Sequence, residues 1–313
     1  MISMVRLSQS SNARVIGRRG NVPPLSHSTD RAGYPVIAAI ITSAALLTPA
    51  NLLISPAMIT ATCAALLIGG LPHGALDLAV LRRDARHQIA RVVSIYLILA
   101  AAMFTTWQVA PSLALALFLG MAVVHFAEDW AACEHPFFAI GIAVSLMSAP
   151  ALLHHQAMGE LFALLTGTPD AAQLADALLL VAPVAAACAL LAMVLLCNSG
   201  HRATAANAAC AIAAMILLPP ITGFAIYFCL IHSPAHFRTG LSCLPPRTIV
   251  ASPTIVATLG GLAIAVVAFQ FLPVAAPYTR LFAASFMTLS ILTLPHMAVP
   301  FLIRYAGKLA RPF

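Results

Sequence analysis

The chain has 313 residues, of which 61% are hydrophobic and only 8% are charged. A soluble domain of this size cannot hide so much apolar surface, so the composition excludes a soluble protein and indicates a polytopic membrane protein. The net charge is +7, but the basic residues do not form a patch, which argues against a nucleic-acid partner. The seven cysteines include no C-x-x-C pair, so neither a zinc ribbon nor a redox motif is predicted.

The N-terminal residues 1–33 are polar, rich in Ser and Arg and poor in acidic residues, and we predict a disordered cytoplasmic arm. Arg18 and Arg19 leave a twin-arginine export signal as an alternative. The apolar run that begins at about Tyr34 is long enough to span a membrane, however, so we favour an uncleaved first helix.

A membrane-spanning helix needs about 20 apolar residues, and prolines mark the ends of most such runs in this chain. We predict an all-α transmembrane bundle of about eight to ten spans, because two of the candidate segments are short. A long loop is expected at about 155–173. The candidate spans, in chain order, are 34–53, 57–80, 92–109, 111–127, 137–154, 174–197, 203–218, 221–238, 253–272 and 281–303.

The basic residues set the predicted orientation, because Arg and Lys gather in cytoplasmic loops. With the N-terminus in the cytoplasm, only Arg280 of the 16 basic residues falls on the outer side. Both termini are then cytoplasmic, in a multi-pass protein of the inner (plasma) membrane. The predicted organisation is the arm 1–33, a membrane-embedded helical domain 34–306 that carries the candidate site, and a cytoplasmic tail 307–313.

Five histidines lie on four predicted spans that all run from outside to inside: His73, His125, His232, His236 and His296. Each falls in the cytoplasmic half of its span. At about 1.5 Å rise per residue, His73, His232 and His296 lie about 10 Å below the inner helix ends, and the other two lie nearer the surface. A polar ring in lipid is costly and hydropathy does not demand one common depth, so a single buried site is indicated.

His232 and His236 are four residues apart, so both rings lie on one helix face, where they can bind the same metal ion. Ser233 stands where the zinc-protease motif H-E-x-x-H has its glutamate, so protease chemistry lacks its general base. Four or five imidazoles without a thiolate suit iron, copper or zinc. A metal at this depth has access to substrates dissolved in lipid.

Two carboxylates follow histidines at the same four-residue spacing, Asp77 after His73 and Asp129 after His125. A metal-bound histidine usually donates its second N–H to such a group, so we expect each aspartate to orient the histidine one turn before it. The alternative for Asp129 is that it only marks the aqueous end of its span. His296 follows Pro295, which bends the helix and frees a backbone carbonyl, and an ordinary kink is the alternative there.

Aromatic residues on the same spans are candidates for lining a substrate tunnel, although aromatics in membrane helices more often serve packing or the interface belts. The candidates are Trp107, Phe118, Phe126, Tyr227, Phe228 and Phe286.

In this order on a multispan chain, GLPHGALD, HFAED, IHSPAHFR and LTLPHM resemble the Brp/Blh family, the bacteriorhodopsin-related-protein-like β-carotene 15,15′-dioxygenases of bacteria and archaea. The likeness runs from about Leu66 to Tyr305. It implies one non-haem Fe(2+) and cleavage of the central double bond of β-carotene, or a related carotenoid, by O2 to give retinal. Carried over residue by residue, it implies that the iron is bound by His73, His125, His232 and His236.

The resemblance places His296 close to these ligands. His296, Asp77 and Asp129 are candidates for an additional ligand or for supports of the ligands. It implies a lipophilic carotenoid and O2 as partners, and hand-over of retinal to a rhodopsin or another user of retinal. The chain departs from the family pattern at 1–55, which extends beyond the likeness, and at Ala235, where many relatives carry a larger or polar residue.

Three other classes of protein stay open. A di-iron desaturase or hydroxylase needs more histidines in several clusters. A metal or proton transporter needs histidines at staggered depths across the membrane. A haem-binding protein could use paired histidines on facing helices.

Overall fold

The computed structural model describes residues 55–244, 252–272 and 276–309, with a few isolated positions between 39 and 49. Within these residues the chain forms helices and no strand, and seven helices are long and apolar enough to cross a membrane. The chain therefore has the all-α, multi-pass membrane fold that its composition predicts. The predicted arm 1–33, most of the predicted span 34–53 and the end of the tail lie outside the described residues.

The helices follow the predicted spans closely, with short connections between them. They are α4 (Pro56–Asp84), α5 (Ile89–Val109), α6 (Pro111–Phe126), α7 (Pro136–Thr166), α8 (Gln173–Asn198), α9 (Arg202–Leu217), α10 (Pro220–Tyr227), the π-helical turn η4 (Phe228–His232), α11 (Ser233–Cys243), α13 (Ser252–Phe271) and α14 (Pro277–Leu309). A short 3-10 turn, η2 (Ala127–Trp130), continues α6. The segments α10, η4 and α11 follow without a break and form one helical rod in place of the predicted span 221–238.

Proline begins several of these helices, among them those that start at Pro56, Pro111 and Pro136. At the first helical position its missing N–H costs nothing, and its fixed backbone angle suits the helix. Ser55 adds a cap to α4, because its hydroxyl accepts a hydrogen bond from the N–H of Met58 at 3.3 Å. The helix starts therefore follow directly from the sequence.

The expected loop at 155–173 is largely helical, so that prediction is wrong. After a local break at His154 (φ −125°, ψ 31°), α7 continues to Thr166 and ends at Gly167 in the left-handed conformation (φ 70°). The segment is amphipathic: polar Glu160 is exposed, while every third or fourth residue is buried in the bundle. The residues buried along this segment include Met158, Phe162 and Leu165.

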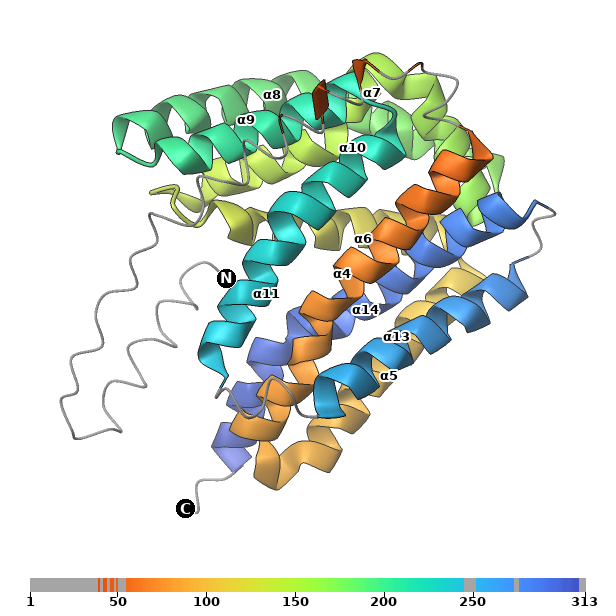
Figure 1. Ribbon diagram of the computed structural model, residues 1–313, viewed down its shortest axis with the longest axis vertical. Coiled ribbons are helices and arrows are strands. Elements are labelled where there is room, and N and C mark those ends of the chain that lie inside the picture. Colours follow the sequence, from red (N-terminus) through yellow and green to blue (C-terminus); the bar gives the residue numbers. More distant parts are fainter. Residues whose placement is uncertain are drawn as a thin grey trace.

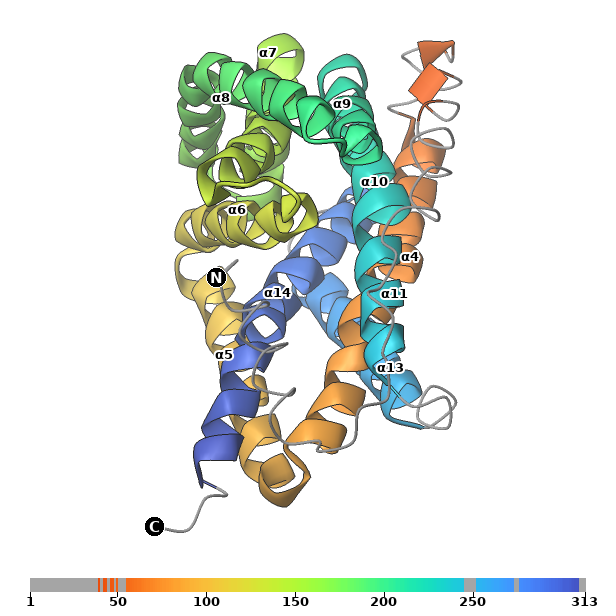
Figure 2. The same cartoon turned by 90° about the vertical axis from the view of Figure 1, so that its left-hand side faces the viewer.

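The bundle has two parts joined by crossing helices (Figures 1 and 2). Helices α7, α8 and α9 pack together at one end, while α13 packs on α4 and α14, and α5 packs on α14. The rod α10–η4–α11 runs from α9 down along α4, and α6 contacts both α7 and α14. Trp107 of α5 donates its indole N–H to Ser290 of α14 at 3.0 Å in the buried interface. This arrangement brings together the segments that carry the candidate histidines.

Candidate metal centre

Three imidazole rings meet where the end of α6 reaches the rod. One ring nitrogen from each of His125, His232 and His236 lies within 4.8 Å of the other two. The ring centroids of His232 and His236 are 4.4 Å apart, as their four-residue spacing predicts, and that of His125 lies 4.8 and 4.9 Å from them. Two nitrogens about 2.1 Å from one ion are at most about 4.2 Å apart. The spacing of these nitrogens is therefore close to what binding of a single ion requires.

A local rearrangement of the rod positions His232. Pro234, two residues further on, has no N–H to donate to the helical hydrogen-bond ladder, and the π-helical turn η4 ends directly before α11. The hydroxyl of Ser233 donates to the carbonyl of Gly69 on α4. A Cβ atom at Gly69 would approach Cys229 Sγ to 3.2 Å, so a glycine here lets α4 come close to the rod.

Asp129 holds two of the three rings. Its Oδ2 accepts from His232 Nδ1 at 2.9 Å, and its Oδ1 lies 3.0 Å from His236 Nε2. Tyr227 donates its hydroxyl to the same carboxylate at 2.6 Å, and the aspartate side chain is only 5% exposed. These contacts engage Nδ1 of His232 and Nε2 of His236, so the nitrogens that could bind a metal are Nε2 of His232 and Nδ1 of His236.

Asp129 contacts His232 and His236, not His125 as its four-residue spacing predicts. The spacing would bring Asp129 and His125 together only if an α-helix ran through both residues, but α6 ends at Phe126 and continues as the 3-10 turn η2. Asp129 consequently faces the rod, and the carboxylate of Glu128 lies 3.6 Å from Nδ1 of His125. The burial of the Asp129 side chain also argues against the alternative that this residue only marks the aqueous end of the span.

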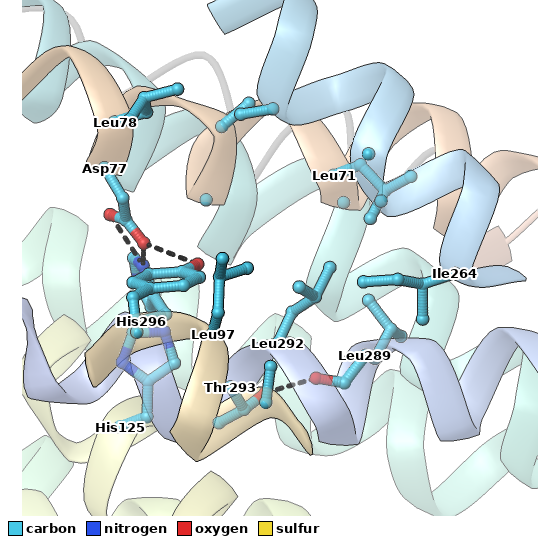
Figure 3. A pocket seen from close by; sticks show the side chains of 18 of the residues that line it. Leu71, Asp77, Leu78, Leu97, His125, Ile264, Leu289, Leu292, Thr293 and His296 are labelled. Atoms are coloured by element: carbon cyan, nitrogen blue, oxygen red, sulfur yellow. Dashed lines mark hydrogen bonds and ion pairs between the residues drawn. The ribbon is translucent and has the colours of Figure 1, made fainter. Parts of the chain in front are cut away.

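His296 of α14 extends the cluster. Its ring centroid lies 5.0 Å from that of His125, and its Nδ1 donates to the carboxylate of Asp77 at 2.8 Å (Figure 3). Tyr96 of α5 donates its hydroxyl to Asp77 at 3.3 Å. The centre is thus flanked by two similar arrangements, in each of which a tyrosine donates to an aspartate that holds a histidine. The sequence signal for Tyr96 is a lone phenol within the apolar run of its span.

His73 lies on α4, one helical turn before Asp77, and its side chain is outside the described residues. The next residue, Gly74, lies so close to the cluster that a Cβ atom there would be 4.0 Å from His296 Nδ1. The backbone of α4 at this level therefore borders the centre. Metal binding by His73 itself stays a prediction.

A cavity of about 440 Å³ adjoins the centre. Its wall contains His125, His296, Asp77 and Tyr96 and is otherwise mostly apolar, with contributions from α4, α5, α6, the rod, α13 and α14. Figure 3 shows the two histidines and the aspartate on one side of the cavity, with leucine and isoleucine side chains on the other. A lipophilic molecule in the cavity would therefore lie directly beside the centre.

The six aromatic tunnel candidates divide into two groups. Phe118, Phe126 and Phe228 line the cavity, as does Phe224, whereas Trp107, Tyr227 and Phe286 are not part of its wall. Trp107 is bonded to Ser290 and borders a separate cavity of about 170 Å³. Tyr227 is fully buried and bonded to Asp129. The hydroxyl and indole groups explain these two placements, because buried polar groups are drawn to hydrogen-bond partners.

The charges around the centre fit a divalent cation. Asp77 and the side chain of Asp129 are buried in an apolar bundle, and Glu128 lies beside His125. Buried carboxylates are costly unless they are hydrogen-bonded and balanced by positive charge. A divalent ion bound to the neutral imidazoles would offset two of these charges, and the all-nitrogen donor set suits iron, copper or zinc. The fold and the site define a multi-pass helical membrane protein with a buried histidine centre beside an apolar cavity.

Comparison with known proteins identifies the family. The family model described as beta-carotene 15,15′-dioxygenase matches residues 64–303, and the chain belongs to this family, which confirms the resemblance carried by the four motifs. A relative from uncultured marine bacterium 66A03, named beta-carotene 15,15′-dioxygenase, is 33% identical over 184 residues, which cover 54% of this chain and 64% of the relative. The chain thus spans less than two thirds of that relative's length. No solved structure matches this chain.

Proposed function

We propose that the protein is a membrane dioxygenase that uses Fe(2+) and O2 to cleave the central double bond of β-carotene, or a related carotenoid, into two molecules of retinal. The observation that carries this proposal is the position of a buried histidine cluster in the wall of an apolar cavity. Membership of a family with this description agrees with it.

The proposed iron ligands are His73, His125, His232 and His236, with His296 beside them as a further ligand or as a support held by Asp77. When bound, the iron supplies the site at which O2 is activated. Asp129 keeps His232 and His236 in fixed orientations, so that both rings are already aligned when the ion arrives.

The remaining work of the protein is to position the polyene and exclude water. Phe118, Phe126 and Phe228 line the cavity beside His125 and present flat apolar faces to a conjugated chain. An apolar pocket also keeps water away from the reacting double bond. Each of the two aldehydes formed receives one oxygen atom of O2, so the reaction balances without an external reductant.

The geometry favours this function over the alternatives. A di-iron desaturase or hydroxylase needs a second metal site and an electron donor. In the described part of the chain, the histidines that could bind a metal form one group. A transporter needs sites at staggered depths, but the rings of His125, His232, His236 and His296 are in one cluster. Elemental analysis distinguishes our proposal from a di-iron enzyme, since our proposal requires one iron per chain and a di-iron enzyme requires two.

We further propose that the protein lies in the inner membrane with both termini in the cytoplasm. The basic residues support this orientation: Arg82 and Arg83 end α4, Arg202 begins α9, and Arg304 lies near the end of α14, all at predicted cytoplasmic ends. A reporter that is active only in the cytoplasm, fused to the C-terminus, should be active, and activity only of an export-dependent reporter contradicts this topology. Retinal released into the bilayer would be available to a rhodopsin or another retinal user.

Expression in a β-carotene-producing bacterial host tests the activity. The orange colour should fade and retinal should appear in chromatograms of cell extracts, while the His232→Ala variant should leave the pigment intact. Persistent β-carotene in cells that contain well-expressed, iron-loaded protein would contradict this substrate.

A further inference from the structure

We propose that the cavity opens sideways into the bilayer on the side formed by α5 and α13, and that the carotenoid enters the site through this mouth. This entry route rests on the proposed function. Its occupant is a long apolar polyene taken from the membrane.

The open side of the cavity is identified by the exposure of its wall residues. Most of the wall is buried or half-buried, but Leu97 of α5 is 61% exposed and Val256 of α13 is 54% exposed, and Gly260 of α13 is exposed as well. These three are the exposed residues among those that line the cavity, and all of them are apolar. An aqueous entrance would instead be bordered by polar side chains.

The outer surface around this mouth has the character of a lipid-facing surface. Ile98, next to Leu97, is 64% exposed, and Ile255, next to Val256, is 60% exposed, yet neither lines the cavity. Both helices are apolar enough to span a membrane, and these positions lie within their spans. Large exposed aliphatic side chains at this level are expected to contact lipid tails, so the mouth opens into hydrocarbon.

Two adjacent glycines on α13 have different surroundings at the mouth. A Cβ atom at Gly261 would lie 3.0 Å from Leu71 of α4, so this glycine permits close helix packing. A Cβ atom at Gly260 would meet no heavy atom within 4 Å, although this residue lines the cavity. The absence of a side chain at Gly260 therefore leaves the mouth wide rather than serving helix packing.

The test uses neighbouring residues as matched controls. Leu97→Trp and Val256→Trp place a bulky ring at the mouth, whereas Ile98→Trp and Ile255→Trp place the same ring on the lipid-facing surface at similar exposure. Full-length, iron-loaded protein is reconstituted in vesicles whose bilayer contains β-carotene. We expect the initial rate of retinal formation to fall about tenfold or more in the mouth variants and to stay within about twofold in the controls. Iron content should be equal in all four.

Equal rates in the mouth variants and their controls would overturn the proposal, and so would an equal loss of rate in both. A second readout is independent of catalysis. In the His232→Ala background, protein purified from a β-carotene-producing host should carry uncleaved pigment, the mouth variants should lose it, and the control variants should retain it.

The rate of retinal formation and the amount of bound pigment together distinguish a failure of the entry route from a failure of the proposed cleavage reaction. A wild-type protein that forms no retinal, while the mouth variants alone lose bound pigment, rejects the cleavage reaction and retains the entry route. If the His232→Ala protein without a mouth substitution holds lipid acyl chains and no carotenoid, the entry route is overturned.

Discussion

Oδ2 of Asp129 lies 2.9 Å from Nδ1 of His232 in the interior of the bundle. The contact leaves Nε2 as the nitrogen of His232 that can bind a metal, and the same carboxylate reaches His236 at 3.0 Å. One side chain thus sets the orientation of two proposed ligands that lie on a different segment of the chain.

Asp129→Asn should weaken iron binding by about 10- to 100-fold, because one of the two carboxylate oxygens becomes an NH2 group, which cannot accept from the ring that it faces. Elemental analysis after dialysis against graded chelator concentrations measures this change. Glu160→Gln, an exposed carboxylate on α7, is the control and should bind iron as the wild type does. Wild-type affinity in Asp129→Asn would show that the carboxylate does not position the ligands.

Tyr227→Phe should destabilise the fold by about 1–3 kcal/mol, because it removes a hydrogen bond to a buried carboxylate. It should also lower iron affinity less than Asp129→Asn does, since the aspartate remains in place. Thermal unfolding in a mild detergent gives the stability. Tyr305→Phe, at an exposed position on α14, should leave the melting temperature unchanged. Equal melting temperatures in both variants would contradict the role of Tyr227.

His73→Ala and His296→Ala separate the two candidates for the remaining ligand. Under our proposal His73→Ala abolishes bound iron, whereas His296→Ala retains it, more weakly held. His155→Ala, in which a half-exposed ring bonded to Asp176 is lost, should retain a full complement of iron. Full iron in His73→Ala together with none in His296→Ala would exchange the roles of the two histidines.

Trp107→Phe should destabilise the protein by about 1–3 kcal/mol through loss of the hydrogen bond to Ser290, while activity per bound iron stays the same. The reason is that Trp107 lies outside the wall of the main cavity. Phe228→Ala, by contrast, removes part of that wall and should raise the KM for β-carotene. A loss of activity per bound iron in Trp107→Phe would show that Trp107 contributes to the substrate tunnel after all.

Local patterns made much of the fold predictable from the sequence. Apolar runs and prolines give the spans, because both act within one segment, and the spacing of His232 and His236 places their rings together within one helical rod. The amphipathic continuation of α7 was not predictable in this way, because its polar positions resemble those of a loop until their burial against α8 is known.

The partners of the aspartates depend on tertiary packing. Asp77 and His296 are 219 residues apart, and no spacing rule relates them. Asp129 turns away from His125 because α6 tightens into a 3-10 turn after Phe126, a change that the sequence pattern does not reveal. The histidine cluster could therefore be found from the sequence, whereas the carboxylates that hold His232, His236 and His296 required the structure.

Cleavage of β-carotene under ¹⁸O-labelled dioxygen tests the central claim most directly. Purified, iron-loaded protein is supplied with β-carotene in vesicles, and the aldehydes are reduced at once to alcohols so that exchange with water is prevented. Mass spectrometry should show an ¹⁸O atom in both halves of the cleaved molecule. Label in only one half would contradict a dioxygenase mechanism, and absence of any cleavage product would contradict the proposed function.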